Sequence, residues 1–304
     1  MKIKDIFSKK KPVISFEIFP PKKDSSIDTI YKTIDELIPL KPDYISVTYG
    51  AGGTLNNNKT IEIASYIKNT CNIEALAHLT SITSTKEIIN KILDELSKNN
   101  IENILALRGD FPQGENIELI ENLHFKYAKD LVNHINDYDD KFCVGGTCYP
   151  EGHIETRDIE KEIIYLKEKV DIGTSFLVSQ LFFDNSLFYD FKERVDKKGI
   201  NVPIQAGIMP VINKKQINRI ATLCGASLPR KFTKIMDEYE SNSEALMDAG
   251  IAYATEQIID LLSSGIDGIH IYTMNNPEVA RRISGNIASI VSALNSNKNS
   301  KNNF

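Results

Sequence analysis

VISFEIF, at residues 13–19, is a short run rich in β-branched and aromatic residues, and seven comparable runs follow it along the chain. They are YISVTYG (44–50), EALAHLT (74–80), NILALRG (103–109), FCVGGTCY (142–149), SFLVSQLFF (175–183), VPIQAGIM (202–209) and GIHIYTM (268–274). Successive runs begin 31, 30, 29, 39, 33, 27 and 66 residues apart, and every spacing except the last fits one strand followed by one helix. Eight such units predict an α/β fold in which parallel strands close into a single (β/α)8 TIM barrel, with extra helices before the last strand.

The segments between these runs have helical periodicity. One apolar stripe advances in steps of three and four residues and consists of Ile27, Ile30, Ile34, Leu37 and Ile38. Ser84 and Glu87 fit a capping box that begins a second helix. Its stripe consists of Ile88, Ile89, Ile92, Leu93 and Leu96. We therefore expect amphipathic helices that pack around the barrel.

Length, composition and charge limit the class of protein. The 304 residues are 41% hydrophobic and 25% charged, which is enough apolar material for one large core. We expect a single catalytic barrel domain at residues 1–294 and a flexible polar tail at 295–304, NSNKNSKNNF. The net charge of −5 disfavours a nucleic-acid binder, and no apolar run of 18 residues predicts a membrane span.

The cysteines and the amino terminus indicate a cytoplasmic protein. Cys71, Cys143, Cys148 and Cys224 lack the C-x-x-C spacing of zinc and redox sites, so reduced thiols are expected. No group of His, Asp and Glu has ligand spacing, and no metal is predicted. The first residues, MKIKDIFSKKKP, carry lysines without the apolar segment of a secretory signal.

A carboxylate interrupts the first predicted strand. Ile14, Phe16 and Ile18 share one parity and suit the helix layer, whereas Ser15 and Glu17 point to the barrel lumen. A buried carboxylate is costly unless it has partners. Glu17 therefore fits either a salt bridge at the barrel rim or a desolvated carboxyl group suited to general acid chemistry.

Other polar residues also collect at the carboxyl ends of the predicted strands, where barrel enzymes carry their active sites. Arg108 and Asp110 fit a local ion pair or a ligand site, and His78 and His153 fit core or rim positions as well as ligand contacts. The glycine-rich run at 50–53 does not follow G-x-G-x-x-G, so it indicates no Rossmann nucleotide site. These residues predict a barrel enzyme without naming its reaction.

At these same positions the sequence resembles the methylenetetrahydrofolate reductase family. The matching motifs are SFEIFPPK (15–22), SVTYGAGG (46–53), AHLT (77–80), LALRGD (105–110), YPEGH (149–153), LKEKVDIG (166–173), SQLFFD (179–184), GIMPV (207–211) and HIYTMN (270–275). They occur in the family's order over nearly the whole predicted barrel, and the chain length fits the short bacterial form. The resemblance implies reduction of 5,10-methylenetetrahydrofolate to 5-methyltetrahydrofolate, a step of one-carbon metabolism and methionine supply.

The resemblance also implies non-covalent FAD across the carboxyl mouth of the barrel. Carried over motif by motif, the flavin contacts are Thr48, Tyr49, His78, Arg108, Gly109 and Asp110. The ribityl, pyrophosphate and adenosine contacts are Ala128, Tyr149, His153, Thr156, Glu162, Tyr165 and Lys169. The positive charges of Arg108 and Lys169 suit the pyrophosphate, which a net-negative protein would otherwise repel.

The implied mechanism is ping-pong, with NADH as the expected electron donor. Glu17 resembles the family's general acid, which protonates the departing nitrogen when the five-membered folate ring opens, and Asp110 is the second catalytic residue, beside the flavin. The implied contacts to folate and nicotinamide are Glu17, Thr48, Asp110, Gln180, Gln216, Ile220 and Tyr272.

Four positions depart from the family pattern. Ile220 stands where a close bacterial relative has Phe, and Asn276 and Glu168 each replace an Arg. Glu162 replaces an Asp in the adenosine region. These changes leave the electron donor open between NADH, NADPH and a partner protein.

Two other kinds of protein remain as alternatives. A pterin-binding methyltransferase barrel would hold folate without flavin, and an interaction subunit would keep the barrel without turnover. The combined presence of Glu17, Asp110 and Gln180 argues against the interaction subunit, since a scaffold does not need that set. A homo-oligomer of unspecified size is expected from the family.

Overall fold

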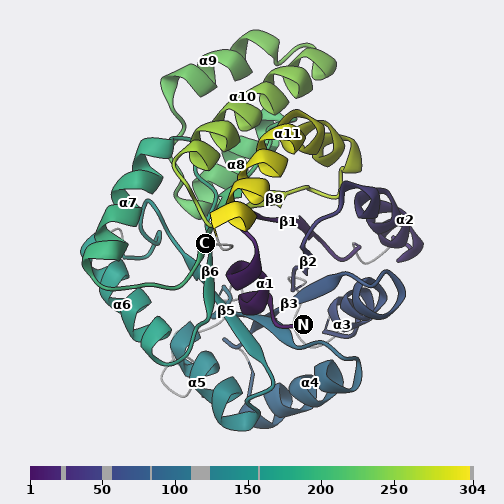
Figure 1. Ribbon diagram of the computed structural model, residues 1–304, viewed down its shortest axis with the longest axis vertical. Coiled ribbons are helices and arrows are strands. Elements are labelled where there is room, and N and C mark those ends of the chain that lie inside the picture. Colours follow the sequence, from purple (N-terminus) through teal and green to yellow (C-terminus); the bar gives the residue numbers. More distant parts are fainter. Residues whose placement is uncertain (22–24, 50–56, 83, 111–123, 157, 302–304) are drawn as a thin grey trace.

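Eight parallel strands form one closed barrel in the computed structural model, in the order β1 to β8 (Figure 1). The structure describes residues 1–304 except 22–24, 50–56, 83, 111–123, 157 and 302–304. The strands are β1 (Val13–Ile18), β2 (Tyr44–Val47), β3 (Glu74–Thr80), β4 (Asn103–Leu107), β5 (Cys143–Cys148), β6 (Phe176–Ser179), β7 (Ile204–Ile208) and β8 (Gly268–Tyr272). The predicted barrel is confirmed, and each strand lies within its predicted run.

Most predicted runs are longer than the strands, chiefly at their carboxyl ends. Thr48, Tyr49, Arg108 and Gly109 lie beyond the last paired residues of β2 and β4. Their side chains are therefore carried by loops at the mouth of the barrel, which is the end that positions ligands in this architecture.

Helices surround the strands, and three of them lie between β7 and β8, as predicted. The helices are α1 (Ile3–Lys9), α2 (Asp28–Leu37), α3 (Asn57–Ser65), α4 (Lys86–Lys98), α5 (Ala128–Tyr138), α6 (Ile159–Asp171), α7 (Asn185–Lys197), α8 (Lys214–Cys224), α9 (Arg230–Tyr239), α10 (Ser243–Ser263) and α11 (Pro277–Lys301). In Figure 1, α9 and α10 extend the ring on one side, beyond α7 and α8. No helix in the described part of the chain is both long and apolar enough to cross a membrane.

The first strand has the predicted division of its two faces. Ile14, Phe16 and Ile18 belong to the large apolar cluster between the strands and the outer helices. Ser15 and Glu17 face the lumen, where both make polar contacts. Alternation along a single strand therefore separates the packing surface from the polar surface.

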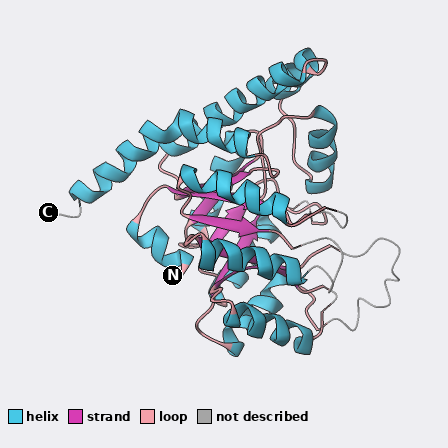
Figure 2. Cartoon of the chain, turned by 90° about the vertical axis from the view of Figure 1, so that its right-hand side faces the viewer, coloured by secondary structure: helices cyan, strands magenta, loops and turns pink. Residues whose placement is uncertain are grey.

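A helix that the sequence reading missed closes the amino-terminal end of the lumen. Ile3, Ile6 and Phe7 of α1 pack against strand-start residues such as Tyr44 and Phe176. Figure 2 shows this short helix beside the amino terminus, at one end of the barrel. Its apolar spacing is visible in IKDIF, but a helix of seven residues, about two turns, is too short for periodicity to distinguish it from a loop.

The start of α4 and the end of α11 differ from the boundaries that the sequence predicts. The cap of α4 is Thr85, whose side chain accepts a hydrogen bond from the backbone of Ile88, so the predicted Ser84 cap is wrong by one residue. Helix α11 continues through Lys301 and so includes part of the segment predicted as a flexible tail from Asn295. The flexibility of that segment stays a prediction.

Candidate active site at the carboxyl end of the barrel

Glu17 lies buried in the lumen between two histidines. Its Oε2 atom is 3.5 Å from Nε2 of His78 on β3 and 3.4 Å from Nε2 of His270 on β8. The parallel register explains the arrangement, since Ser15 is paired with His270 and Glu17 with Tyr272 across β1 and β8. The register therefore brings His270 to the carboxyl group from the neighbouring strand, and His78 reaches it from β3, beyond β2.

The histidine from β3 is uncharged at neutral pH. Burial lowers the pKa of His78 to about 4, although the nearby Glu17 carboxylate opposes that shift. The same ring nitrogen lies 2.6 Å from the hydroxyl of Ser46. Among the described residues no lysine or arginine forms an ion pair with Glu17, so its partners are hydrogen-bonding groups.

Tyr272 closes one side of this lumen site. Its hydroxyl donates to the carbonyl oxygen of Ser179 at 2.8 Å, and its ring meets His270 edge-on. Burial raises the pKa of Tyr272 well above its usual value, so it stays protonated. A Cβ atom at Gly207 would lie 2.3 Å from that carbonyl oxygen and 2.7 Å from the tyrosine hydroxyl, and only glycine leaves room for this contact.

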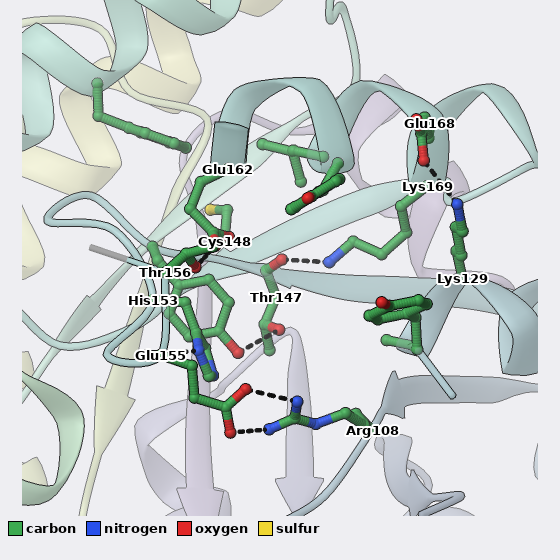
Figure 3. A pocket seen from close by; sticks show the side chains of 16 residues that line it. Arg108, Lys129, Thr147, Cys148, His153, Glu155, Thr156, Glu162, Glu168 and Lys169 are labelled. Atoms are coloured by element: carbon green, nitrogen blue, oxygen red, sulfur yellow. Dashed lines mark hydrogen bonds and ion pairs between the residues drawn. The ribbon is translucent and has the colours of Figure 1, made fainter. Parts of the chain in front are cut away.

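A separate cavity of about 460 Å³ lies beside the lumen site, between the ends of β4 and β5 and helices α5 and α6 (Figure 3). It is lined by Arg108, Tyr127, Ala128, Lys129, Thr147, Cys148, Tyr149, His153, Glu155, Thr156, Glu162, Tyr165, Leu166, Glu168, Lys169 and Phe191. We call this space the outer cavity. Its lining combines aromatic rings, hydroxyl groups and charges of both signs.

Lys169 is a buried cation on the wall of the outer cavity. Its ammonium group donates to the carbonyl oxygen of Thr147 at 2.5 Å (Figure 3). Burial lowers the pKa of Lys169 to about 8, an effect that the nearby Cys148 and Glu162 oppose. A buried ammonium beside an open space suits an anionic group, because such a charge is stabilised only by a close partner.

Two ion pairs cross the more exposed part of the outer cavity. The Arg108 guanidinium donates to both carboxylate oxygens of Glu155, at 2.6 and 2.7 Å, and these bonds lower the pKa of Glu155. Lys129 pairs with Glu168 at 2.7 Å. Glu168 is one of the four departures from the family pattern, and Lys129 on α5 supplies the opposite charge.

Aromatic rings form the remaining walls. Tyr127 and Tyr165 are 49% and 50% exposed although both line the cavity, so each presents a ring face or edge to open space. Tyr149 packs edge-on against His153, and its hydroxyl lies 3.3 Å from that of Thr147. Flat rings with adjacent hydroxyls suit a heteroaromatic ligand.

The structure brings most predicted cofactor residues together. Eight of them line the outer cavity, namely Arg108, Ala128, Tyr149, His153, Thr156, Glu162, Tyr165 and Lys169. His78 lies instead in the lumen beside Glu17, and Thr48, Tyr49, Gly109 and the exposed Asp110 follow β2 and β4 at the mouth.

Of the predicted folate and nicotinamide residues, Glu17, Thr48 and Asp110 lie on or after β1, β2 and β4, and the other four lie at the ends of β6 and β8 and on helix α8. Gln180 follows β6, and its side-chain oxygen accepts from the backbone of Leu181. Gln216 is exposed in the first turn of α8, while Ile220 packs on the apolar cluster of α8, α9 and α10. Residues 50–53, part of one matching motif, lie outside the described residues.

Several residues of both regions were not predicted. The lumen partners Ser46 and His270, and the cavity residues Tyr127, Lys129 and Glu155, had no assigned role. Parity within GIHIY could have identified His270, since alternate residues of a strand share one face. Glu155 is 47 residues from Arg108 in sequence, and nothing local indicates that contact.

Comparison with known proteins identifies relatives along nearly the whole chain. The family model described as Methylenetetrahydrofolate reductase matches residues 2–288. The protein of Pectobacterium carotovorum named 5,10-methylenetetrahydrofolate reductase is 34% identical over 271 residues, covering 89% of this chain and 88% of the relative. Methylenetetrahydrofolate reductase (NADH) 1 of Arabidopsis thaliana is 36% identical over 284 residues, covering 90% of this chain. The chain spans about half of that plant protein, 48% of its length.

A solved structure supports the architecture. An uncharacterised protein from Clostridium thermocellum that binds two copies of 5-methyl-5,6,7,8-tetrahydrofolic acid superposes with a TM-score of 0.68. The alignment covers 96% of this chain and 99% of that protein at 15% sequence identity. At that identity the likeness concerns the fold alone.

Proposed function

This chain belongs to the methylenetetrahydrofolate reductase family, and from that premise we propose that it reduces 5,10-methylenetetrahydrofolate to 5-methyltetrahydrofolate. The proposed reaction uses bound FAD and a reduced nicotinamide, and it supplies methyl groups for one-carbon metabolism and methionine synthesis. The observation that carries the proposal is the buried carboxyl group of Glu17, held between His78 and His270 at the barrel mouth.

The outer cavity has side chains that suit FAD. Lys169 provides a buried positive charge and Arg108 a second, part-buried one, both suited to a pyrophosphate. Tyr165, with Tyr127 nearby on the lining, suits an adenine or ribose face. When bound, FAD supplies hydride-transfer chemistry that amino-acid side chains lack. We propose the thirteen residues predicted above as its contacts, with Tyr127 added to them.

Glu17 is the proposed general acid. Opening the five-membered ring of the folate needs a proton on the departing nitrogen, and a positioned carboxylic acid can supply it. Burial of Glu17 and its contacts with polar ring nitrogens support that role over a rim salt bridge. Asp110, at the end of β4, is the proposed second catalytic residue, and its contacts stay a prediction.

The proposed substrate contacts surround the same mouth. Gln180 follows β6 and Tyr272 ends β8, the two strands that flank β7. Gln216 and Ile220 lie on α8, the helix that follows β7. Thr48, Glu17 and Asp110 complete the proposed set for folate and nicotinamide. We infer a ping-pong order in which the reduced nicotinamide leaves before the folate binds.

NADH is the proposed electron donor, on the printed name of the Arabidopsis relative. We propose a cytoplasmic location because all four cysteines are free thiols. A homo-oligomer is proposed from the family alone, and a partner protein that delivers electrons is the alternative to a free nicotinamide.

Anaerobic mixing tests the proposed function. The purified protein is expected to be yellow from bound oxidised FAD, to bleach with NADH faster than with NADPH, and to regain colour when methylenetetrahydrofolate is added. A colourless protein that binds the folate but not FAD would instead indicate a pterin-binding methyltransferase barrel. A yellow protein that bleaches with neither nucleotide, yet recovers after chemical reduction when folate is added, would indicate a protein electron donor.

A further inference from the structure

A chain of hydrogen bonds runs through the lumen from the amino-terminal core to Glu17. The Tyr44 hydroxyl contacts Oε1 of Gln205, and Nε2 of Gln205 lies 3.1 Å from the hydroxyl of Ser15. That hydroxyl lies 2.7 Å from Nδ1 of His270, whose Nε2 is 3.4 Å from Glu17. We call these groups the lumen relay.

The direction of the lumen relay is fixed by Gln205. Its Nε2 atom also faces the carbonyl oxygens of Val13, at 3.2 Å, and Ile269, at 3.3 Å. A carbonyl oxygen can only accept, so this end of the amide must be the NH2 group. Its Oε1 atom then accepts from Tyr44. The NH2 group has two hydrogens, and Ser15 Oγ, at 3.1 Å, is the nearest of its three acceptors.

This direction favours hydrogen on one of the two ring nitrogens of His270. Because Ser15 Oγ accepts from Gln205, its own hydrogen is free to be donated to Nδ1 of His270. In the neutral ring the hydrogen is then on Nε2, which faces the Glu17 carboxyl group. Tyr44, four contacts away along the lumen relay, therefore helps to keep the N–H of His270 directed at the Glu17 carboxyl group.

We propose that His270 is a positioning residue for Glu17, held by the lumen relay so that its Nε2 hydrogen stabilises the carboxylate that remains after Glu17 gives up its proton. The inference rests on the proposed function, because it concerns Glu17 as general acid. The proton passes from the Glu17 carboxyl group to the departing nitrogen of the folate, and His270 keeps its hydrogen throughout. The contact of 3.4 Å is expected to shorten when the carboxylate is charged.

Other titratable groups around Glu17 do not supply this donor. Tyr44 from β2 and Tyr272 from β8 stay protonated because burial raises the pKa of each phenol. Their hydroxyl groups donate elsewhere, to Oε1 of Gln205 and to the carbonyl oxygen of Ser179. His78 from β3 is neutral, and its Nε2 atom is shared with the hydroxyl of Ser46. Of the groups described around the carboxyl, His270 is the one whose hydrogen is directed to it by a fixed relay.

Nitrogen NMR of histidine tests the tautomer directly, without turnover. In the 15N-histidine-labelled protein near pH 7.5, the His270 signals, assigned by their loss in His270→Gln, are expected to show hydrogen on Nε2 and none on Nδ1. Ser15→Ala is expected to raise the Nδ1–H population, because Nδ1 loses its donor. An Nδ1–H tautomer in the wild type would overturn the inference.

Kinetics of the two half-reactions test the consequence. His270→Phe is expected to slow the folate half-reaction about tenfold and move its high-pH fall upward by about one to two pH units, the effect of losing one hydrogen bond to a charged group. His270→Gln keeps an N–H donor and is expected to restore most of the rate and the wild-type pH profile. Cys143→Ala, another lumen side chain but at the far end, is the matched control and should change neither.

The outcomes separate this inference from the proposed function. Normal flavin reduction by the donor shows that each variant is folded and loaded. If Glu17→Gln loses the folate half-reaction while His270→Phe keeps the wild-type rate and pH profile, the role of His270 is wrong and the function stands. If Glu17→Gln keeps the folate half-reaction, the assignment of the acid is wrong and the inference fails with it.

Discussion

The lumen site around Glu17 and the outer cavity around Lys169 hold their polar groups in opposite ways. Glu17, Ser15 and His270 are buried on strands and are connected by hydrogen bonds. The outer cavity is bordered by helices and loops, and Arg108 and Glu155 form a part-exposed ion pair there. Sheet register fixes the positions of the polar groups in the lumen site. In the outer cavity, ion pairs hold the charged groups, and a ligand can replace one partner of such a pair.

This difference corresponds to two tasks. A proton donor needs a constant geometry and little water, which neighbouring strands provide because their register allows one arrangement. A site for a large anion needs cations whose partners can be replaced without unfolding, and part-exposed ion pairs contribute little to stability. We therefore assign proton transfer to the lumen site and cofactor affinity to the outer cavity, and we expect mutations in the two regions to have separate effects.

The largest expected effect comes from removing the acid. Glu17→Gln should slow reduction of methylenetetrahydrofolate by about 10²–10⁴, the usual contribution of a general acid, and leave FAD affinity and flavin reduction by NADH unchanged. Stopped-flow absorbance measures the two half-reactions separately. Glu36→Gln, an exposed carboxylate on α2, is the matched control. Equal loss in both half-reactions would mean that the lumen site is not confined to proton transfer.

Removing the buried positive charge of Lys169 should change only the affinity for FAD. Lys169→Met is expected to weaken FAD binding to the apoprotein by about 10–100-fold, because a hydrogen-bonded charge facing the pyrophosphate is lost. Lys167→Met removes the same charge from the exposed side of α6, where Lys167 pairs with Asp171, and should leave the affinity unchanged. Titration with FAD, followed by flavin fluorescence, measures both. Equal weakening of FAD binding in the two variants would mean that the effect depends only on the net charge of the protein.

The pH dependence of FAD affinity sharpens the role of Lys169. Burial lowers the pKa of this lysine to about 8, so the free protein carries the charge below that pH and loses it above. The dissociation constant of FAD should therefore be nearly flat below pH 8 and rise by up to about tenfold per pH unit above it. In Lys169→Arg, which stays charged, the rise should vanish. An unchanged rise in that variant would assign the titration to another group.

The smallest expected effect concerns the ion pair at the cavity edge. Glu155→Gln removes the negative charge that pairs with Arg108, so FAD should bind up to about fivefold more tightly, within the range of a part-exposed ion pair. Glu160→Gln, which removes a similar exposed pair with Arg194, is the control. Weaker binding in Glu155→Gln would show that Glu155 orients Arg108 toward the ligand and does not compete with it.

The sequence predicted the fold more completely than the site. Eight runs at regular spacing determine a parallel barrel, because strand alternation and right-handed crossovers leave few other arrangements. The short helix α1 was missed since Ile3, Ile6 and Phe7 span too few turns for periodicity, and its burial depends on the shape of the lumen. The predicted cap, Ser84, differs from the observed cap, Thr85, by one residue because Ser and Thr can both cap a helix.

For the site, local patterns identified residues but not their partners. Glu17 was recognised as an isolated carboxylate, yet its histidines come from β3 and β8, 61 and 253 residues away. Register between strands, which closure of the barrel fixes, brings them together. The ion pair of Arg108 with Glu155 likewise depends on two loops, whose conformations a single sequence does not specify.

A double-mutant cycle with Glu17→Gln and Lys169→Met tests the division of labour most directly. With FAD saturating, the folate half-reaction of the double variant is expected to equal that of Glu17→Gln. Its FAD dissociation constant is expected to equal that of Lys169→Met, and each should agree within about 0.5 kcal/mol. If Lys169→Met at saturating FAD slowed the folate half-reaction as much as Glu17→Gln does, or if Glu17→Gln weakened FAD binding tenfold, proton transfer and cofactor affinity would not be separate functions of the two regions.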